Sequence, residues 1–212
     1  MNELLSAIKS KKDQLDSLRP ESPAALSSLR KYYDVELTYT SNAIEGNTLT
    51  LRETAELIEH GITVGGKPLR DHLEAVDHYD AVLWMRELAA SAANLDEMTV
   101  REMLRRIVFR SQPETGGVYS SLPRRGAGSP VLFPNPLKIP DLMRDFGVWL
   151  GLIELTPWMS FEAHFRLVAI HPFADSRTAR LLMSPCVRQI GKLTWMRWNT
   201  LRLRKISSPS RC

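Results

Sequence analysis

Residues 171–183 read HPFADSRTARLLM, and this stretch decides how the rest of the sequence is interpreted. It places a histidine, an acidic residue and two arginines three positions apart within ten residues, and an apolar run follows. The histidine precedes a proline and follows a helix-prone segment, so we expect it at the boundary between two elements. The arginines fall in the first turn of the next predicted helix. Cations are unfavourable there unless an anion is bound.

Four side chains of this stretch have residue types that suit a functional site. The imidazole of His171 titrates near neutral pH, so it can accept a proton from a hydroxyl nucleophile. Asp175 offers a hard oxygen ligand of the kind that holds Mg²⁺ together with phosphate oxygens and water. Arg177 and Arg180 lie where backbone N–H groups already favour anions. Each residue alone is more often a surface side chain, an ion-pair member or a helix cap. The four together favour a functional site.

The composition is that of a globular protein. Of 212 residues, 43% are hydrophobic and 25% are charged, which fits one domain with a sizeable core. No run approaches the ~18 apolar residues of a membrane-spanning helix, and the first residues lack the apolar centre of a signal peptide. The two cysteines, Cys186 and Cys212, show no disulfide framework and no metal-binding spacing. We expect a cytoplasmic protein without a membrane partner.

The formal charge of +4 is concentrated in residues 192–212, which hold six basic residues and no acidic one. Such a segment can bind nucleic acid, and Trp195 and Trp198 could add stacking. A solvated terminal tail is the commoner case. We therefore treat residues 192–212 as a basic tail and consider nucleic acid an unlikely partner.

Helical periodicity dominates the rest of the chain. Pro23 suits the first turn of a helix that Gly46 ends, and Thr50 and Glu53 have capping-box spacing in a helix that stops at Gly61. Further helical patterns cover residues 70–91, 96–110, 138–155, 156–170 and 177–191. In the 70–91 helix we expect one apolar face, made of Leu73, Val76, Tyr79, Val82, Leu83 and Met85.

Residues 111–136 differ in composition, because Gly, Ser and Pro surround two short extended runs. This pattern predicts a loop and a β-hairpin with Gly126 and Gly128 near its tip. The fold class is therefore mostly α with one small β element.

HPFADSRTARLLM resembles the signature of Fic-domain proteins, His-Pro-Phe-x-Asp/Glu-Gly-Asn-Gly-Arg-x-x-Arg. FEAHFRLVAI, residues 161–170, is similar to the helix that leads into that signature. Residues 116–143 are similar to the family's hairpin, called the flap, and to its Pro-rich connection. TSNAIEGNTLT resembles the family's inhibitory-helix motif through Ser41, Glu45 and Gly46. These motifs follow the family's order and span about residues 30–185.

The resemblance implies a Fic-type helical bundle with one small β-hairpin, the flap, next to the active site. It divides the chain into three regions. Residues 1–66 form an N-terminal helical region with the inhibitory helix, residues 67–191 form the Fic core, and residues 192–212 form the basic tail.

The resemblance also implies a reaction, the transfer of AMP from ATP to a Ser, Thr or Tyr hydroxyl of a protein. His171 would be the base and Asp175 would hold Mg²⁺ on the phosphates. Ser176 and Arg177 would contribute to nucleotide binding, and Arg180 would pair with the γ-phosphate.

The same resemblance implies a restraint and a docking element. Glu45, steadied by Ser41, would pair with Arg180 and so restrain the enzyme. The flap would align the target protein by strand addition, through Gly117, Val118, Tyr119 and Ser120. The target could be the chain itself, and a homodimer stays open.

The sequence departs from the family signature at one point. Where the family has Gly-Asn-Gly between the acid and the first arginine, this chain has only Ser176. Both glycines of the turn whose N–H groups form an anion-binding nest are missing. A displacement of about 1 Å can cost ~100-fold in rate. Beyond Met183 the sequence also lacks the family's regular apolar helix. Two hypotheses therefore stay open, an adenylyltransferase restrained by Glu45 and a catalytically inactive Fic-fold module that binds nucleotide or protein.

Overall fold

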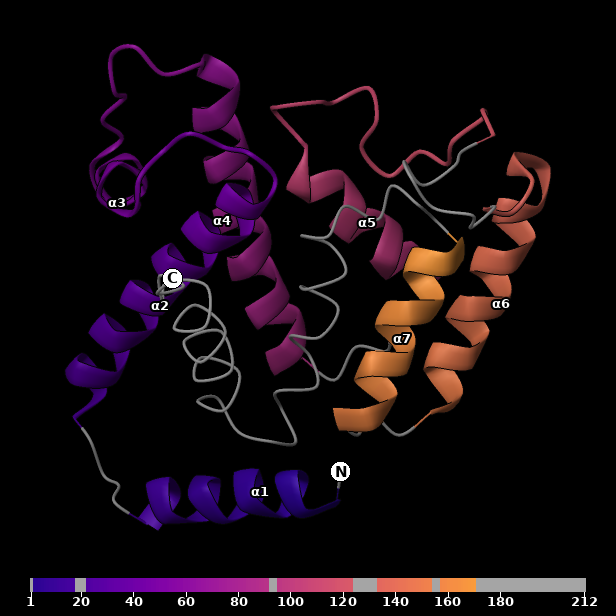
Figure 1. The fold of residues 1–212 in the computed structure, drawn as a ribbon, viewed down its shortest axis with the longest axis horizontal. Helices are drawn as coiled ribbons and strands as arrows, with labels where there is room; N and C mark the ends of the chain where they lie inside the picture. The colour runs from indigo at the N-terminus through magenta and orange to yellow at the C-terminus, as the bar shows by residue number, and fades with distance from the viewer. Residues whose placement is uncertain (1, 18–21, 92–94, 124–132, 154–156, 171–212) are drawn as a thin grey trace, which may run out of the picture.

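The computed structural model describes residues 2–17, 22–91, 95–123, 133–153 and 157–170 (Figure 1). These ranges contain α1 (Asn2–Ser17), α2 (Pro23–Ile44), α3 (Leu51–His60), α4 (Leu69–Ala90), α5 (Glu97–Ile107), the 3₁₀ turn η1 (Pro136–Lys138), α6 (Ile139–Leu152) and α7 (Pro157–Ile170). The prediction of a mostly α fold is confirmed for them. No strand occurs within these ranges, and residues 111–123 form turns and bends. Gly126 and Gly128, the predicted tip of the hairpin, lie outside the described residues.

The long helix α4 occupies the middle of the helical assembly (Figure 1). It contacts α2 and α3 on one side and α5 on the other, and α6 contacts both α5 and α7. The predicted N-terminal region ends at residue 66, and the predicted Fic core begins at residue 67. Helices α2 and α3 of the first region contact α4 of the second. The division of the chain into regions stays a prediction.

The helix ends predicted from capping residues are confirmed. Pro23 occupies the first turn of α2 as predicted, and the structure adds a cap, Ser22, which accepts a hydrogen bond from the Ala25 N–H (3.1 Å). At α3, Thr50 and Glu53 form both bonds of the capping box. Gly46 and Gly61 follow α2 and α3 with φ of 91° and 68°, in the left-handed region that glycine adopts without a steric penalty.

The main apolar core joins five helices. Its fully buried side chains include Met85 of α4, Met103 of α5, Met143 of α6 and Leu167 of α7, and Leu37 of α2 completes it. Flexible methionine side chains fill irregular gaps between helices. A second, smaller cluster packs α3 onto α4 through Leu49, Leu57 and Ala75. The two clusters fix α4 between its neighbours.

The predicted apolar face of α4 is partly wrong. Val82 and Met85 are buried as expected, but Leu83 is 38% exposed, and Leu73, Val76 and Tyr79 are only half-buried. Polar residues are buried in their place, namely Asp71, His72, Glu74, Asp77 and His78. Helices and loops cover α4 from two sides, so burial is not confined to one apolar stripe. Hydrogen-bond partners distant in sequence offset the cost of burying the polar groups.

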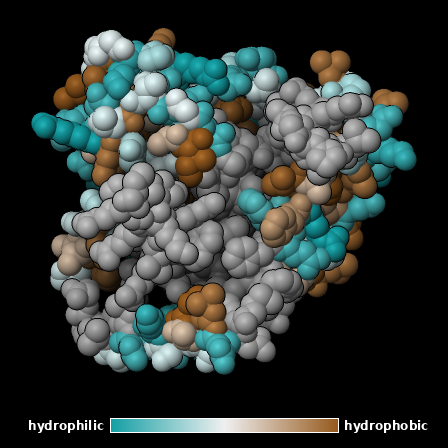
Figure 2. Space-filling model, viewed as in Figure 1, coloured by the Kyte–Doolittle hydropathy of each residue, from teal (hydrophilic) through white to brown (hydrophobic). Residues whose placement is uncertain are grey.

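The described surface is mixed in character. Hydrophilic side chains alternate with scattered hydrophobic ones on the face drawn in Figure 2. The exposed apolar residues include Val148 and Leu152 of α6 and Phe165 of α7. Single exposed apolar side chains are common on protein surfaces and need no special explanation.

Gly147 allows α6 to approach the start of α5 closely, and this contact gives a testable prediction. A Cβ atom at this position would lie 2.6 Å from the Glu97 backbone nitrogen. We expect Gly147→Ala to lower the free energy of unfolding by about 1–3 kcal/mol, because the helices must separate to accept it. Urea titration followed by circular dichroism measures the change.

Gly151 on the same helix provides the matched control. A Cβ atom there meets nothing within 4 Å, so Gly151→Ala should raise helix propensity and add up to about 1 kcal/mol. Equal effects of the two substitutions would contradict the close approach of α6 to α5.

Candidate functional site

The residues predicted to carry the reaction lie beyond the end of α7. His171, Asp175, Ser176, Arg177 and Arg180 are outside the described residues, and their roles stay predictions. The structure does describe α7, which ends at Ile170 directly before His171. Ala163 and Leu167 of α7 are buried in the main core. Core packing therefore fixes α7, the helix that ends directly before His171.

The predicted inhibitory motif lies at the C-terminal end of α2. Ser41 is 1% exposed and belongs to the last helical turn, whereas Glu45 is exposed and caps the helix. The Glu45 N–H donates to the Asn42 carbonyl (3.0 Å) and the Gly46 N–H to the Ala43 carbonyl (3.1 Å). Glu45 therefore lies in a turn that backbone hydrogen bonds hold, and its side chain is on the protein surface.

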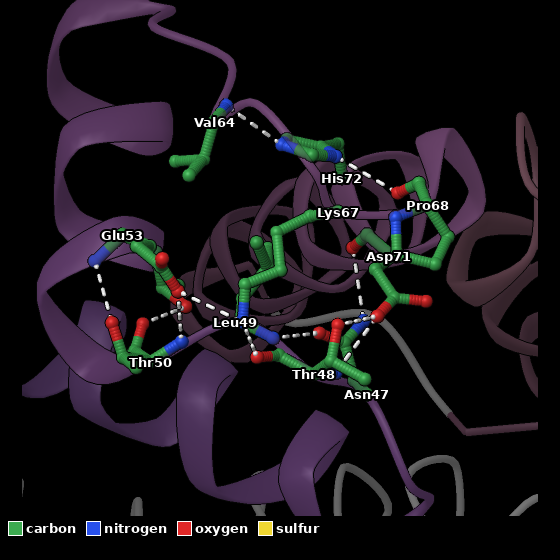
Figure 3. Close-up of polar contacts among 11 residues, drawn as sticks. Asn47, Thr48, Leu49, Thr50, Glu53, Val64, Lys67, Pro68, Asp71 and His72 are labelled. Atoms are coloured by element: carbon green, nitrogen blue, oxygen red, sulfur yellow. Dashed lines mark hydrogen bonds and ion pairs between the residues drawn. The ribbon is translucent and has the colours of Figure 1, made fainter.

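The residues that follow this motif are tied to α4. Thr48 donates to Asp71 Oδ2 twice, from its backbone nitrogen (2.7 Å) and from its hydroxyl (2.6 Å). The side-chain amide of Asn47 donates to the Asp71 carbonyl (2.9 Å) and to Glu74 Oε2 (3.1 Å). We call these four bonds the α4 clamp, and Figure 3 shows the three of them that join Asn47 and Thr48 to Asp71. Thr48 and Asn47 each contribute two donors, so the clamp fixes both the backbone and the side chains of this turn.

A second set of polar contacts fixes the loop between α3 and α4 beside the clamp (Figure 3). Lys67 Nζ donates to the Thr48 carbonyl (2.6 Å) and lies 3.6 Å from Glu53 Oε2. The hydrogen bond from the Thr50 backbone N–H to Glu53 is the main cause that lowers the pKa of Glu53. His72 Nε2 lies 3.0 Å from the Val64 nitrogen, which can only donate, so this ring nitrogen accepts. The loop is thus anchored to both α3 and α4.

The four residues predicted to dock a target begin close to α5. Gly117 has φ of 69°, and a Cβ atom there would lie 2.9 Å from the Arg101 carbonyl oxygen. Arg101 Nε donates to the Gly117 carbonyl (3.1 Å). Glycine is therefore required at 117 by both the backbone conformation and the close approach.

Tyr119 makes the second contact of this segment with α5. Its hydroxyl donates to Glu97 Oε1 (2.6 Å), and the Arg101 guanidinium lies 5.1 Å from its ring centroid. Burial and the Glu97 carboxylate raise the pKa of Tyr119, so the hydroxyl keeps its proton and remains a donor. Val118 is exposed between these two anchors. The base of the predicted flap is thus fixed, while strand pairing with a target stays a prediction.

The Tyr119–Glu97 bond gives a prediction that can be measured. Tyr119→Phe removes the hydroxyl but keeps the ring under Arg101, so we expect a loss of about 0.5–1.5 kcal/mol in the free energy of unfolding. Urea denaturation monitored by tryptophan fluorescence is the measurement. The exposed Tyr32 supplies the matched control, and Tyr32→Phe should change stability by much less. A null effect of Tyr119→Phe would contradict a stabilising bond to Glu97.

Asp77 of α4 holds the segment that leads from α5 toward Gly117. Its Oδ2 accepts from the backbone nitrogens of Arg110 (2.8 Å) and Ser111 (2.9 Å), and its Oδ1 accepts from Arg110 Nη1 (3.0 Å). Asp77 is fully buried, and Arg110 also pairs with Asp80 at 2.9 Å. One helix therefore anchors the inhibitory segment through Asp71 and the approach to the predicted flap through Asp77.

Two classes of site are absent from the part of the chain that the structure describes. Within it, no three histidine, cysteine or acidic side chains are grouped to hold a metal ion. The predicted Mg²⁺ ligand, Asp175, lies outside it. Likewise, none of the described helices combines the length and the apolar character needed to cross a membrane.

Sequence reasoning missed the acidic residues of α4 and α5 that fix these segments, namely Asp71, Glu74, Asp77 and Glu97. Their partners lie far away in sequence, and the Thr48–Asp71 pair alone spans 23 residues. The available signal was the run of charged residues within an otherwise helical apolar pattern at 70–80.

Comparisons with known proteins identify relatives of this chain. No family model matches the sequence. The chain is 32% identical over 196 residues to the protein adenylyltransferase Fic of Drosophila erecta, covering 88% of this chain and 38% of that protein. Its match to the protein adenylyltransferase Fic of Nematostella vectensis is also 32% identical, covering 89% of this chain and 45% of that protein. The chain thus spans less than half the length of these curated relatives.

Solved structures share the fold. Fic-1 of C. elegans (residues 134–508) aligns with a TM-score of 0.74 at 24% identity, covering 98% of this chain and 65% of that one. A Fic domain containing signaling protein from Bacteroides thetaiotaomicron aligns with a TM-score of 0.75 at 25% identity, covering 92% and 79%. The helical arrangement described above is therefore that of these proteins.

Proposed function

Because this chain belongs to the Fic domain family, we propose that it transfers AMP from ATP to a hydroxyl side chain of a protein. The observation that carries the proposal is the 32% identity over 196 residues to proteins named protein adenylyltransferases. The residue types in HPFADSRTARLLM support it, because they supply a base, an acidic ligand and cations for phosphate. The nucleotide would bind with Mg²⁺.

In the proposed reaction, the oxygen of the target hydroxyl forms a bond to the α-phosphorus of ATP. The bond from that phosphorus to the bridging oxygen breaks, and pyrophosphate leaves with the electron pair. His171 accepts the hydroxyl proton as general base. Asp175 would hold Mg²⁺, which neutralises phosphate charge when bound. Ser176, Arg177 and Arg180 would bind the phosphates. Arg180 would do so through a bidentate, charge-assisted contact.

The proposed restraint acts through Glu45. Its carboxylate would pair with Arg180 and so compete with the γ-phosphate of ATP for that arginine. The exposed position of Glu45 at the end of α2 supports this role. Ser41, which is buried one turn earlier, would steady the Glu45 side chain.

The target would be a protein, and the chain itself is one candidate. The segment Gly117–Ser120 would align the target backbone, with Tyr119 fixing the segment on α5 and the exposed Val118 facing outward. A second candidate function is a binding module of the same fold that does not catalyse transfer. The replacement of Gly-Asn-Gly by Ser176 favours it, because the turn loses phosphate-binding N–H groups.

The assignment of the base can be tested with labelled ATP. If the chain transfers AMP, His171→Ala should reduce protein labelling by about 10²–10⁴-fold, because it removes the proposed acceptor of the hydroxyl proton. ATP affinity should stay unchanged. The exposed His60 is the matched control, and His60→Ala should label like the wild type. Equal labelling by His171→Ala and wild type would refute the role.

The shortened turn leads to a further prediction. Replacing Ser176 with Gly-Asn-Gly should raise transfer, because each restored N–H donor to phosphate can contribute about 10²–10³ in rate. Initial rates of labelling are the measurement, and replacement with Ala-Ala-Ala separates the length of the turn from its glycines. An unchanged rate in a folded Gly-Asn-Gly variant would show that the turn is not what limits transfer.

A further inference from the structure

Glu45 lies between two side-chain amides that are both bonded to α4. Before it, Asn42 Nδ2 reaches the Glu74 carbonyl at 3.5 Å. After it, Asn47 Nδ2 donates to the Asp71 carbonyl and to Glu74 Oε2. The Asn47 N–H also returns to the Asn42 carbonyl (3.1 Å). The residues on both sides of Glu45 are therefore hydrogen-bonded to the same part of α4, at Asp71 and Glu74.

Asp71 makes the strongest part of this connection. Its Oδ2 accepts both the backbone N–H and the hydroxyl of Thr48, at 2.7 and 2.6 Å, and the residue is 8% exposed. Short hydrogen bonds to a buried carboxylate are stronger than bonds between neutral groups. Thr48, by contrast, is itself exposed. Without Asp71, little else in the described structure would hold its backbone amide.

A helix end without such an anchor frays. The last turn of a helix opens at little cost in free energy unless tertiary contacts hold it. Glu45 caps α2, and the chain then reverses at Gly46. The direction of the Glu45 side chain thus depends on whether residues 47 and 48 stay in place.

We propose that Asp71 is a positioning residue for Glu45. It holds Thr48 and thereby fixes the end of α2 in the one orientation from which the Glu45 carboxylate restrains ATP binding. The inference rests on the proposed inhibitory role of Glu45. Its consequence is that the restraint can be released at α4, without any change to Glu45 or to the nucleotide-binding residues.

The first measurement is calorimetric titration of the full chain with Mg–ATP, for wild type, Glu45→Gly, Asp71→Ala and the double variant. Asp71→Ala should tighten ATP binding toward the value of Glu45→Gly, and it should add nothing in the Glu45→Gly background. Asp71→Asn keeps an oxygen that can accept both Thr48 donors. It should stay near the wild type.

The second measurement is hydrogen exchange, which needs no nucleotide. The amides of Glu45 and Asn47 donate to the Asn42 carbonyl, an acceptor that Asp71→Ala leaves intact. They should nevertheless exchange about tenfold faster or more in Asp71→Ala, because the loss of two bonds to a carboxylate lets the helix end open. Asp71→Asn should restore most of the protection.

Two controls separate positioning from a general loss of stability or charge. Gly147→Ala destabilises the contact between α5 and α6 and leaves the α4 clamp intact. Glu87→Ala removes an exposed carboxylate from the same helix. Neither should speed the exchange of Glu45 and Asn47 relative to the rest of α2, and Glu87→Ala should leave ATP affinity unchanged.

The outcomes distinguish this inference from the proposed function. If Glu45→Gly tightens ATP binding and Asp71→Ala does not, Asp71 is not a positioning residue, and the inhibitory role of Glu45 stands. If Glu45→Gly has no effect, the inhibitory role fails, and hydrogen exchange alone decides whether Asp71 anchors the end of α2. Unchanged exchange in Asp71→Ala overturns the anchor, and additive effects in the double variant overturn the route through Glu45.

Discussion

The buried carboxylates of α4 are the constraint on which both described parts of the candidate site depend. A carboxylate removed from water must find donors. Asp71 finds them in Thr48, after α2, and Asp77 finds them in the backbone of Arg110 and Ser111, after α5. Each bond joins the helix to a segment without regular structure. Backbone N–H groups supply three of the five donors to these two carboxylates, and the Thr48 hydroxyl and the Arg110 guanidinium supply the other two.

Features set by neighbouring residues could be predicted from the sequence. The ends of α2 and α3 follow from Pro23, Gly46, Gly61 and the Thr50–Glu53 capping box, all of which act within four residues. The mostly α fold class was also predictable, because long amphipathic segments alternate with glycine and proline, whereas the Fic-type bundle followed only from the resemblance to the family. The family motif added the order of the elements.

Features set by distant residues could not be predicted in the same way. The face of α4 was assigned from its apolar residues, yet Asp77 and His78 are more deeply buried than Leu83. The sequence near Asp77 does not indicate that the backbone amides of residues 110 and 111 donate hydrogen bonds to its carboxylate. These bonds offset the free energy lost when the carboxylate is buried. The same holds for Glu97, whose partner Tyr119 follows 22 residues later. The predicted hairpin and the residues from His171 to Arg180 stay predictions, because they lie wholly or partly outside the described ranges.

The close approach at Gly147 has a mechanical consequence for the candidate site. The missing side chain seats α6 against the backbone of Glu97, and the carboxylate of that same residue holds the Tyr119 hydroxyl. α6 also packs against α7, which ends directly before His171. The helix that ends directly before the proposed base and the proposed docking segment thus belong to one stack of helices. Under the proposed function, the packing of these helices would fix the distance between the acceptor hydroxyl and the base. Target choice would then be free to vary in the outer part of the flap without disturbing the alignment for chemistry.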